Sequence, residues 1–287
     1  QGAAPTDFRL NIPRREAEDI LTQYLEREKF DKPRDYAKRW LEDLLEHHLI
    51  QVQSNNQIEF RHQLLQEYYA AEYLLKQLHC LSDAKLKRDY LNYLKWTEPL
   101  ALMLALVEDE AQAVRVVKLA LDVDLMLAAR LAGEVRREFQ KKTVGLVAKL
   151  EISKWFKIEF LGTTRSDEAV SLLCQGLQDE DFDVRWRAAE ALGNIGNKEA
   201  IQDLIRALND TYYYVHESAA KALGKIGTSA AFAPILQALR HKHFSVRSSG
   251  AKVLGKMRNE FAVQELVELL NNDKDDYVRQ CAAEALG

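Results

Sequence analysis

Two Gly-Lys pairs are the closest that this sequence comes to a phosphate-binding loop. Neither Gly224-Lys225 nor Gly255-Lys256 is followed by the Ser or Thr that such a loop uses to hold Mg²⁺. Each pair also falls near the end of a repeated phrase, where glycine commonly ends a helix. The sequence therefore predicts no nucleotide hydrolysis and no catalytic residue within these 287 positions.

The three cysteines offer no second kind of chemistry. Cys80, Cys174 and Cys281 are far apart and form no Cys-x-x-Cys pair, which predicts neither a disulfide framework nor a zinc or other metal site. Cys174 falls in an apolar column and is expected to pack in a core. Cys281 aligns with Arg187 and Ser249 in a column that we expect to be exposed. Free thiols fit a cytoplasmic protein.

Aromatic and charged side chains gather at the turns and along one face of a repeated helical pattern near the C-terminus. Exposed aromatic residues often mark partner-binding surfaces. Packing between adjacent turns is the alternative, and the sequence leaves both open. The candidate partner-binding residues are Trp186, Arg187, Glu190, Tyr212, Tyr213, Tyr214, Glu217, Lys221, His243 and Phe244.

A repeat must position these side chains. Val184, Val215 and Val246 align at a spacing of 31 residues, and Val278 follows after 32. Each unit contains two helical patterns: the first has apolar residues at i, i+3 and i+7, and the second has alanines where helices must approach closely. One such pair cannot bury its apolar faces alone, so the units must stack into an all-α solenoid.

The second pattern of each unit carries a recognisable motif. Residues 181–196 match "D-x-x-V-R-x-x-A-A-x-A-L-G-x-I-G" at every fixed position, and the units of residues 167–287 resemble HEAT repeats of the short type also found in phycobilin lyases. Four units fit, the last of them truncated. Leu161-Gly162 lies one repeat before Leu192-Gly193, which predicts that "KWFKIEFLG" is a degenerate helix leading into the array.

The HEAT resemblance also implies a ladder of Asp and Arg residues. The expected pairs are Asp179 with Arg185 and Asp273 with Arg279. In the units between them, His216 stands where Arg is expected and His241 stands where Asp is expected. These two histidines predict an interruption of the ladder.

The N-terminal part reads differently. A helix is predicted from near Pro13 and another from about Pro33 to His48, followed by two alternating runs around the turn at residues 54–56. Two helices, a hairpin and a further helix are typical of a winged helix. We place this domain at residues 8–62, after a leader or linker at residues 1–7.

The junction "FRHQLLQEYYAAEYLL", residues 60–75, carries a second resemblance. It is similar to the end of the winged helix in NACHT-type STAND NTPases, where an aromatic-x-His precedes a helix written F-Q-E-[FY]-[FY]-A-A; here Leu65 replaces the first Phe. The resemblance implies that His62 senses the β-phosphate of bound ADP. It also implies an upstream NACHT domain that binds ADP or ATP with Mg²⁺. The alternative for His62 is a residue that caps the hairpin or the next helix.

Charge and hydropathy limit the possible partners. Residues 167–287 contain 18 acidic and 14 basic residues, so nucleic acid is an unlikely partner there. Residues 63–166 are predicted to be a helical spacer with degenerate helical repeats. Its basic stretch, residues 130–157, is expected to be a solvated face, with nucleic-acid or acidic-partner contact as the alternative. No apolar run reaches the roughly 18 residues of a membrane span.

Together, the two resemblances predict a non-catalytic regulatory and sensor part of a NACHT-type STAND NTPase, acting in signalling or defence. The HEAT solenoid would bind a protein partner or ligand. The fragment itself is expected to hold no cofactor. One alternative is a HEAT-repeat accessory protein of the phycobilin lyase type, for which a winged helix would be unexpected. A DNA-binding HEAT protein is a third, and the acidic array counts against it.

Overall fold

The computed structural model describes residues 11–227, 229–257 and 260–287. The predicted leader at residues 1–7 lies outside the described residues. The chain divides into two compact units: the first extends to Leu127 and includes 134–136, and the second comprises 128–133 and 137–287. The division falls inside the predicted spacer. Among the described residues, none of the helices combines the length and the apolar character that crossing a membrane would require.

The N-terminal part of the first unit combines two helices with a small sheet. Its elements are β1 (Asn11–Pro13), α1 (Arg14–Arg27), α2 (Pro33–Glu46), β2 (Ile50–Val52) and β3 (Gln57–Phe60). The strands are antiparallel in the order β1-β3-β2. Asn56, with φ of 60°, turns the chain between β2 and β3, which suits the tolerance of asparagine for left-handed backbone. The two helices and the hairpin are confirmed, whereas β1 was not predicted.

A small apolar core joins these helices to the sheet. Ala17 of α1 and Leu41 of α2 are buried against Ile50 and Ile58 of the sheet. Ile58 lies opposite Ile12 of β1 in the register, and Ile12 packs against the same core. This part of the chain therefore has a core of its own.

The rest of the first unit is helical, as predicted. Its elements are α3 (Gln63–Gln77), α4 (Asp83–Leu86), a π-helical turn (Lys87–Leu91), a 3₁₀ turn (Leu94–Trp96), α5 (Thr97–Leu106) and α6 (Glu110–Leu121). Helix α3 packs against α5. Tyr90 and Trp96 meet edge to face with ring centroids 4.7 Å apart. The helix α7 (Leu125–Glu134) then contains the division between the units.

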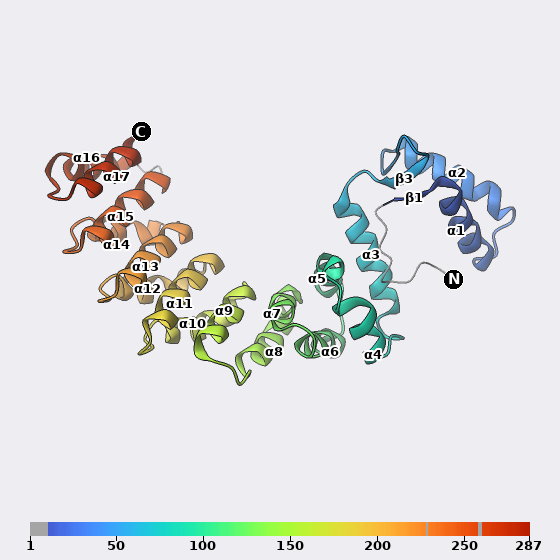
Figure 1. Cartoon of the computed structure of the whole chain (residues 1–287), viewed down its shortest axis with the longest axis horizontal. Coiled ribbons are helices and arrows are strands. Elements are labelled where there is room, and N and C mark those ends of the chain that lie inside the picture. The colour runs from blue at the N-terminus through green and yellow to red at the C-terminus, as the bar shows by residue number, and fades with distance from the viewer. Residues whose placement is uncertain (1–10, 228, 258–259) are drawn as a thin grey trace. The chain divides into compact units, whose positions relative to one another are not determined.

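The second unit continues with a series of helices that stack one after another (Figure 1). Two helices come first, α8 (Arg137–Ala148) and α9 (Lys154–Thr163). Four pairs follow: α10 (Val170–Gly176) with α11 (Phe182–Ile195), α12 (Ile201–Ala207) with α13 (Tyr213–Ile226), α14 (Ser229–Ala238) with α15 (Phe244–Met257), and α16 (Val263–Asn272) with α17 (Asp276–Leu286). Short 3₁₀ turns precede three of the first helices, at Asp167–Ala169, Lys198–Ala200 and Glu260–Ala262. Neighbouring second helices pack on one another in sequence, so the predicted all-α solenoid is confirmed.

Local sequence signals set the ends of the second helices. The side chain of Asp181 accepts a hydrogen bond from the Asp183 amide and caps α11. Gly196 and Gly227 follow α11 and α13 with φ of 78° and 61°, the left-handed conformation that glycine adopts without steric cost. These second helices therefore end at glycines, as the sequence predicts.

The apolar columns of the first helices are buried. Leu173, Leu204, Ile235 and Leu266 are all at most 3% exposed. Val263, at the i position of the last unit, three residues before Leu266, departs from the predicted apolar pattern because it is 45% exposed. Burial of the column in successive units is what a stacked array requires, since each pair covers the apolar face of the next.

Glycines let the second helices approach closely. A Cβ added at Gly162, Gly193 or Gly255 would lie 2.7 Å from an atom of an alanine in the next second helix. That alanine is Ala191, Ala222 or Ala285, respectively. Gly162 lies on α9, so α9 packs on α11 as the later second helices pack on their neighbours. The predicted degenerate helix is therefore present and stacks as part of the array.

The predicted exposed column of Arg187, Ser218, Ser249 and Cys281 is wrong in its last two units. Cys281 is 1% exposed and Ser249 is 6% exposed, although we expected both at the surface. Ser248, on the adjacent position of α15, is also buried at 4%. The small side chains at these positions allow α15 and α17 to pack closely, and close packing removes them from water.

Candidate partner-binding site

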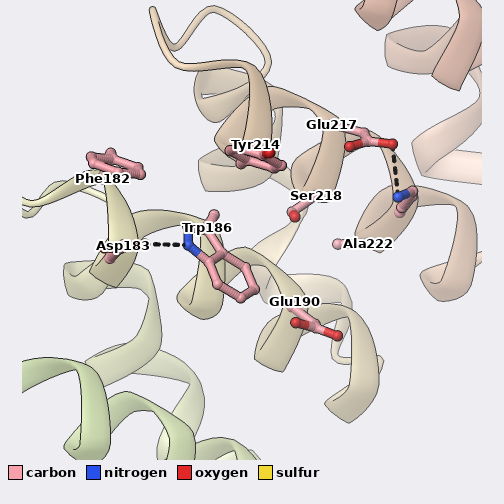
Figure 2. Close-up of a pocket in the computed structure, with 9 residues that line it drawn as sticks. Phe182, Asp183, Trp186, Glu190, Tyr214, Glu217, Ser218 and Ala222 are labelled. Carbon is pink, nitrogen blue, oxygen red and sulfur yellow. Dashed lines mark hydrogen bonds and ion pairs between the residues drawn. The ribbon is translucent and has the colours of Figure 1, made fainter.

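A pocket opens between α11 and α13, the second helices of two neighbouring units (Figure 2). It is a cavity of about 460 Å³. Its lining comes from positions about one helical turn apart on each helix, which share one face. The lining residues are Phe182, Asp183, Trp186 and Glu190 of α11, with Tyr214, Glu217, Ser218, Lys221 and Ala222 of α13.

Three aromatic rings line the pocket. Phe182 and Trp186 come from α11, and Tyr214, which is 61% exposed, faces them from α13. Trp186 Nε1 donates a hydrogen bond of 2.9 Å to Asp183 Oδ1. This bond, drawn in Figure 2, joins the indole ring to the residue one helical turn earlier in α11 and restricts its rotation. The ring is therefore held in place before any partner binds.

Small residues leave the space that the aromatic rings surround. Ser218 and Ala222 line the pocket from α13. Ala222 is also the residue that Gly193 approaches, with a hypothetical Cβ at 2.7 Å from its Cα. The close approach of the two helices at Gly193 and the short side chains of α13 together define the cavity.

Carboxylates outnumber cations around the pocket. Asp183, Glu190 and Glu217 line it together with one ammonium group, that of Lys221. Lys221 Nζ lies 2.8 Å from Glu217 Oε1, and the Glu217 side chain is 22% exposed against 60% for Lys221. Glu190 is exposed. The pocket therefore keeps a net negative charge after its internal ion pair has formed.

The structure brings together five of the ten predicted partner-binding residues. Trp186, Glu190, Tyr214, Glu217 and Lys221 all line the pocket. Four further lining residues, Phe182, Asp183, Ser218 and Ala222, are not among the ten. Their helical spacing from Trp186 and Tyr214 is the signal that could have identified them.

Arg187 lies beside the pocket rather than in it. Its guanidinium carbon is 4.5 Å from the Trp186 ring centroid and 5.0 Å from that of Trp155. Its NH1 lies 3.9 Å from Glu159 Oε2, and its buried Nε has no hydrogen-bond partner among the described residues. Arg187 therefore packs between two indole rings and joins α11 to α9.

Tyr212 is the N-cap of α13 and Tyr213 is its first residue, and neither lines the pocket. The Tyr212 ring stacks on the Phe182 ring with centroids 4.7 Å apart. The guanidinium carbon of Arg185 lies 5.4 Å from the centroid of the Tyr212 ring. Tyr212 therefore packs against the turn of the neighbouring unit, which is one of the two roles that the sequence left open. Tyr213 meets Tyr214 edge to face, with centroids 5.3 Å apart.

The predicted ladder exists, but its partners differ from those expected. Arg185 reaches Asp179 only through its backbone carbonyl, at 2.8 Å. Its ion pair is with Asp210 of the next unit, through Nε at 2.7 Å and NH2 at 3.1 Å. Asp179 is bound by Lys154 of α9, at 2.9 Å. Each pair therefore joins two units, because Asp lies at the turn that faces the preceding second helix.

The last pair repeats this geometry, which corrects the expected partners there as well. Arg247 Nε and NH2 donate to the two carboxylate oxygens of Asp273, at 2.6 and 2.9 Å. Arg279 contacts Asp273 only at its backbone carbonyl. Both side chains of the Arg247 pair are nearly buried, at 7% and 6% exposure. Bidentate pairs of this kind fix orientation as well as distance.

Histidines replace one ion pair of the ladder, as the sequence predicted. His216 is 2% exposed, its Nδ1 lies 3.2 Å from the Asp210 carbonyl oxygen and its Nε2 lies 2.8 Å from Ser245 Oγ. A carbonyl oxygen can only accept, so Nδ1 carries the proton and Ser245 donates to Nε2. His241 Nδ1 accepts a hydrogen bond from the His243 amide, as Asp273 Oδ1 does from Asp275.

His243 completes a group of three rings at this interface. Its centroid is 5.6 Å from those of His216 and His241. Within the part of the chain that the structure describes, no group of three His, Cys, Asp or Glu side chains could hold a metal ion. Phe244, at the start of α15, is 47% exposed and does not line the pocket.

His62 occupies the N-cap position of α3. Its side chain is exposed and forms no capping hydrogen bond. Only its backbone carbonyl takes part, by accepting from the Leu65 amide at 3.0 Å. The interpretation of His62 as a side-chain cap is therefore wrong for α3, and the imidazole is available for another contact.

The thiols are poorly suited to nucleophilic chemistry. Burial, followed by the charge of Asp203, raises the pKa of Cys174 to about 12. Burial also raises the pKa of Cys281. A thiol with a raised pKa is scarcely ionised near neutral pH, and the thiolate is the reactive form.

A second and larger cavity, of about 1110 Å³, lies among α13, α15 and α17. Lys225 and Lys252 line it, and Cys281 contributes from α17. Lys225 donates to Asn194 Oδ1 at 2.7 Å and Lys252 donates to the Tyr277 hydroxyl at 2.7 Å. Both ammonium groups are therefore already engaged within the array.

The stacked helix pairs define an α-solenoid of the HEAT type. The family model for HEAT repeats matches residues 154–223 and 204–287. The predicted HEAT repeats are therefore confirmed, and the match begins at α9. No curated protein sequence is significantly similar to this chain.

Several solved structures of engineered or computationally designed proteins are similar to the chain. Two engineered proteins of the Northeast Structural Genomics Consortium are 21% and 19% identical, cover 75% of this chain and 94% and 67% of their own, and give TM-scores of 0.34 and 0.36. A computationally designed armadillo repeat protein for modular peptide recognition is 19% identical, covers 75% of this chain and 99% of its own, and gives 0.32.

Proposed function

We propose that this chain is the non-catalytic regulatory and sensor part of a NACHT-type STAND NTPase. Its HEAT array would be the scaffold that binds a protein partner or ligand. The observation that carries the proposal is the exposed His62 at the N-cap of α3, within the aromatic-x-His motif that precedes "QEYYAA". A phosphate-sensing histidine must have a free imidazole, and a capping histidine would not.

The sheet supports a winged helix at residues 11–62. Strand β1 adds to the predicted hairpin and gives three antiparallel strands in the order β1-β3-β2. Helices α1 and α2 share the core of that sheet through Ala17 and Leu41. The hairpin β2-β3 then stands where a wing is expected.

The surface of α3 supports an upstream domain as its partner. Leu64, Tyr68, Tyr69 and Tyr73 are 67%, 40%, 45% and 57% exposed on this helix. So many exposed large side chains near His62 are typical of a surface that another domain covers. An upstream NACHT domain holding ADP or ATP with Mg²⁺ would place a phosphate near His62.

The mechanism we propose is a two-state switch in a cytoplasmic signalling or defence protein. His62 would contact the β-phosphate of ADP in the resting state only. A partner that binds the HEAT array better in the open state would shift the population toward that state. The pocket between α11 and α13 is the part of the array that we propose for partner contact.

The native gene gives the first test. A phosphate-binding loop encoded upstream of residue 1 supports the NACHT assignment, and purified full-length protein should then retain ADP. An upstream region without such a loop would reject that assignment and leave the scaffold role standing. The alternative, a phycobilin-lyase-type accessory protein, accounts for the array but gives residues 11–62 no role.

A further inference from the structure

The pocket between α11 and α13 pairs aromatic ring faces with an excess of carboxylates. We propose that it binds the cationic side chain, arginine or lysine, of an extended segment of a partner protein. This inference rests on the proposed scaffold function and names the chemistry of its partner.

Charge selects the sign of the ligand. Lys221 neutralises Glu217, at 2.8 Å. Asp183 accepts a hydrogen bond from Trp186 Nε1, a neutral donor that supplies no positive charge to the carboxylate. Glu190 lies four residues after Trp186 on the same face and is exposed. Two carboxylates therefore remain for a partner, which favours a cation and repels nucleic acid or an acidic peptide.

The rings select a cation over a neutral donor. The faces of Trp and Tyr rings attract ammonium and guanidinium groups through their quadrupole, and Trp does so most strongly. The chain itself places the Arg187 guanidinium 4.5 Å from the Trp186 ring centroid. Because Arg187 does not line the pocket, the part of the Trp186 ring that does line it stays open to a partner.

The size of the pocket fits one long side chain. Its volume of about 460 Å³ lies within the roughly 300 to 1,000 Å³ of sites that hold small ligands. The pocket lies between two neighbouring second helices, α11 and α13. A partner segment can therefore continue along the array beyond it. One anchor residue per segment is therefore the expected mode of recognition.

The test selects random displayed heptapeptides against the full chain and against three variants. The variants are Trp186→Ala, Glu190→Lys and a control, Glu268→Lys, which changes an exposed glutamate of α16 outside the pocket. Peptides from the native chain should share Arg or Lys at one position. Trp186→Ala and Glu190→Lys should each weaken a selected synthetic peptide about tenfold, and Glu268→Lys should not.

A charge exchange then isolates the contact. Replacing the shared Arg or Lys of the peptide by Glu should weaken binding to the native chain about tenfold, and Glu190→Lys should restore part of the loss. Because Glu190 is exposed, its variant should keep the native melting temperature even if Trp186→Ala does not.

The outcomes separate the two proposals. Peptides that depend on Trp186 but share no basic residue would overturn the cation proposal and retain the scaffold function. Basic peptides that bind equally well to Glu190→Lys would also overturn it. If no selected peptide depends on the pocket, or none is selected at all, both the cation proposal and this site of partner binding are rejected.

Discussion

His62 is the residue on which the proposed switch depends. It is exposed, it lies directly before α3, and its side chain does not cap that helix. The sequence could identify the motif but not whether the imidazole forms a capping hydrogen bond, because the motif is the same in both cases. Only the side-chain geometry at the start of α3 separates them.

Replacing His62 by alanine should act on the switch and leave the fold unchanged. A hydrogen bond to a charged group contributes about 1.5 to 3 kcal/mol, so ADP should leave the full-length protein about 10 to 100 times faster. The chain of residues 1–287 should keep its free energy of unfolding within about 0.5 kcal/mol. Stopped-flow release of a fluorescent ADP analogue measures the first quantity, and urea unfolding measures the second.

His79→Ala is the matched control, because His79 is also exposed and lies just beyond the end of α3. It should change neither quantity. An unaltered rate of ADP release in the full-length His62→Ala protein would remove the sensor role.

The core of the array gives a second prediction at the scale of one residue. Leu204 of α12 is fully buried, so Leu204→Ala should lower the free energy of unfolding by about 2 to 5 kcal/mol through lost burial and a cavity. Gln202→Ala changes an exposed position of the same helix and should change it by about 0.5 kcal/mol or less. Urea unfolding that ranks the two in the opposite order would contradict the assigned buried face.

At the scale of elements, the ladder shows how far the sequence could reach. The spacing of Asp179 and Arg185 suggested a pair within one unit, whereas Arg185 binds the Asp210 carboxylate of the next unit. A repeated sequence contains the same spacing within a unit and between units, so it cannot distinguish them. The replacement by His216 and His241 was visible in the sequence, and the hydrogen bond to Ser245 was not.

The histidine interface should make stability depend on pH. Burial lowers the pKa of His216, and His243 acts in the same direction, whereas Asp210 and Glu217 oppose it. Burial lowers the pKa of His241 too, helped by His216, His243, Lys242 and Arg247. Both folded pKa values therefore lie below the ordinary value of about 6.5, and the unfolded chain binds protons first as the pH falls.

The consequence is a loss of stability on mild acidification. The contribution of both histidines is complete above about pH 6.5 and declines as the pH falls from there toward the folded pKa values. The urea midpoint of the array should therefore fall between about pH 7.5 and 5.5. The double variant His216→Arg with His241→Asp introduces an Arg–Asp ion pair like those of Arg185 with Asp210 and Arg247 with Asp273. It should lose most of this pH dependence.

His79→Gln is the control for this experiment, because it removes an exposed histidine away from the interface. Its pH dependence should match that of the native chain. An equal slope of midpoint against pH in the double variant would show that other groups cause the effect.

At the scale of the whole molecule, the predicted periodicity recovered the array but not the N-terminal sheet. Apolar columns repeat every 31 residues and are read directly as helix faces. Strand β1 is only three residues long and pairs with β3 more than forty positions later, as Asn11 with Glu59. Short strands held by distant pairing have no local pattern. The pocket was half predicted, because helical spacing indicates which residues share a face but not how closely α11 and α13 approach.

That approach gives the last prediction. A Cβ at Gly193 would lie 2.7 Å from the Cα of Ala222, so Gly193→Ala must push α11 and α13 apart. Overpacking of this kind costs about 1 to 3 kcal/mol, which equals or exceeds the roughly 1 kcal/mol that alanine adds to helix stability. Gly145 of α8 has nothing within 4 Å of an added Cβ, so Gly145→Ala should be neutral or stabilising by up to about 1 kcal/mol.

Urea unfolding compares the two substitutions, and hydrogen exchange locates the change. Because each unit contacts only its neighbours, Gly193→Ala should reduce protection most in α11 and α13 and progressively less toward α17. Moving α11 and α13 apart should also weaken the binding of the selected peptides to the pocket. If Gly193→Ala stabilises the chain as Gly145→Ala does, the close contact between α11 and α13 does not hold the array together.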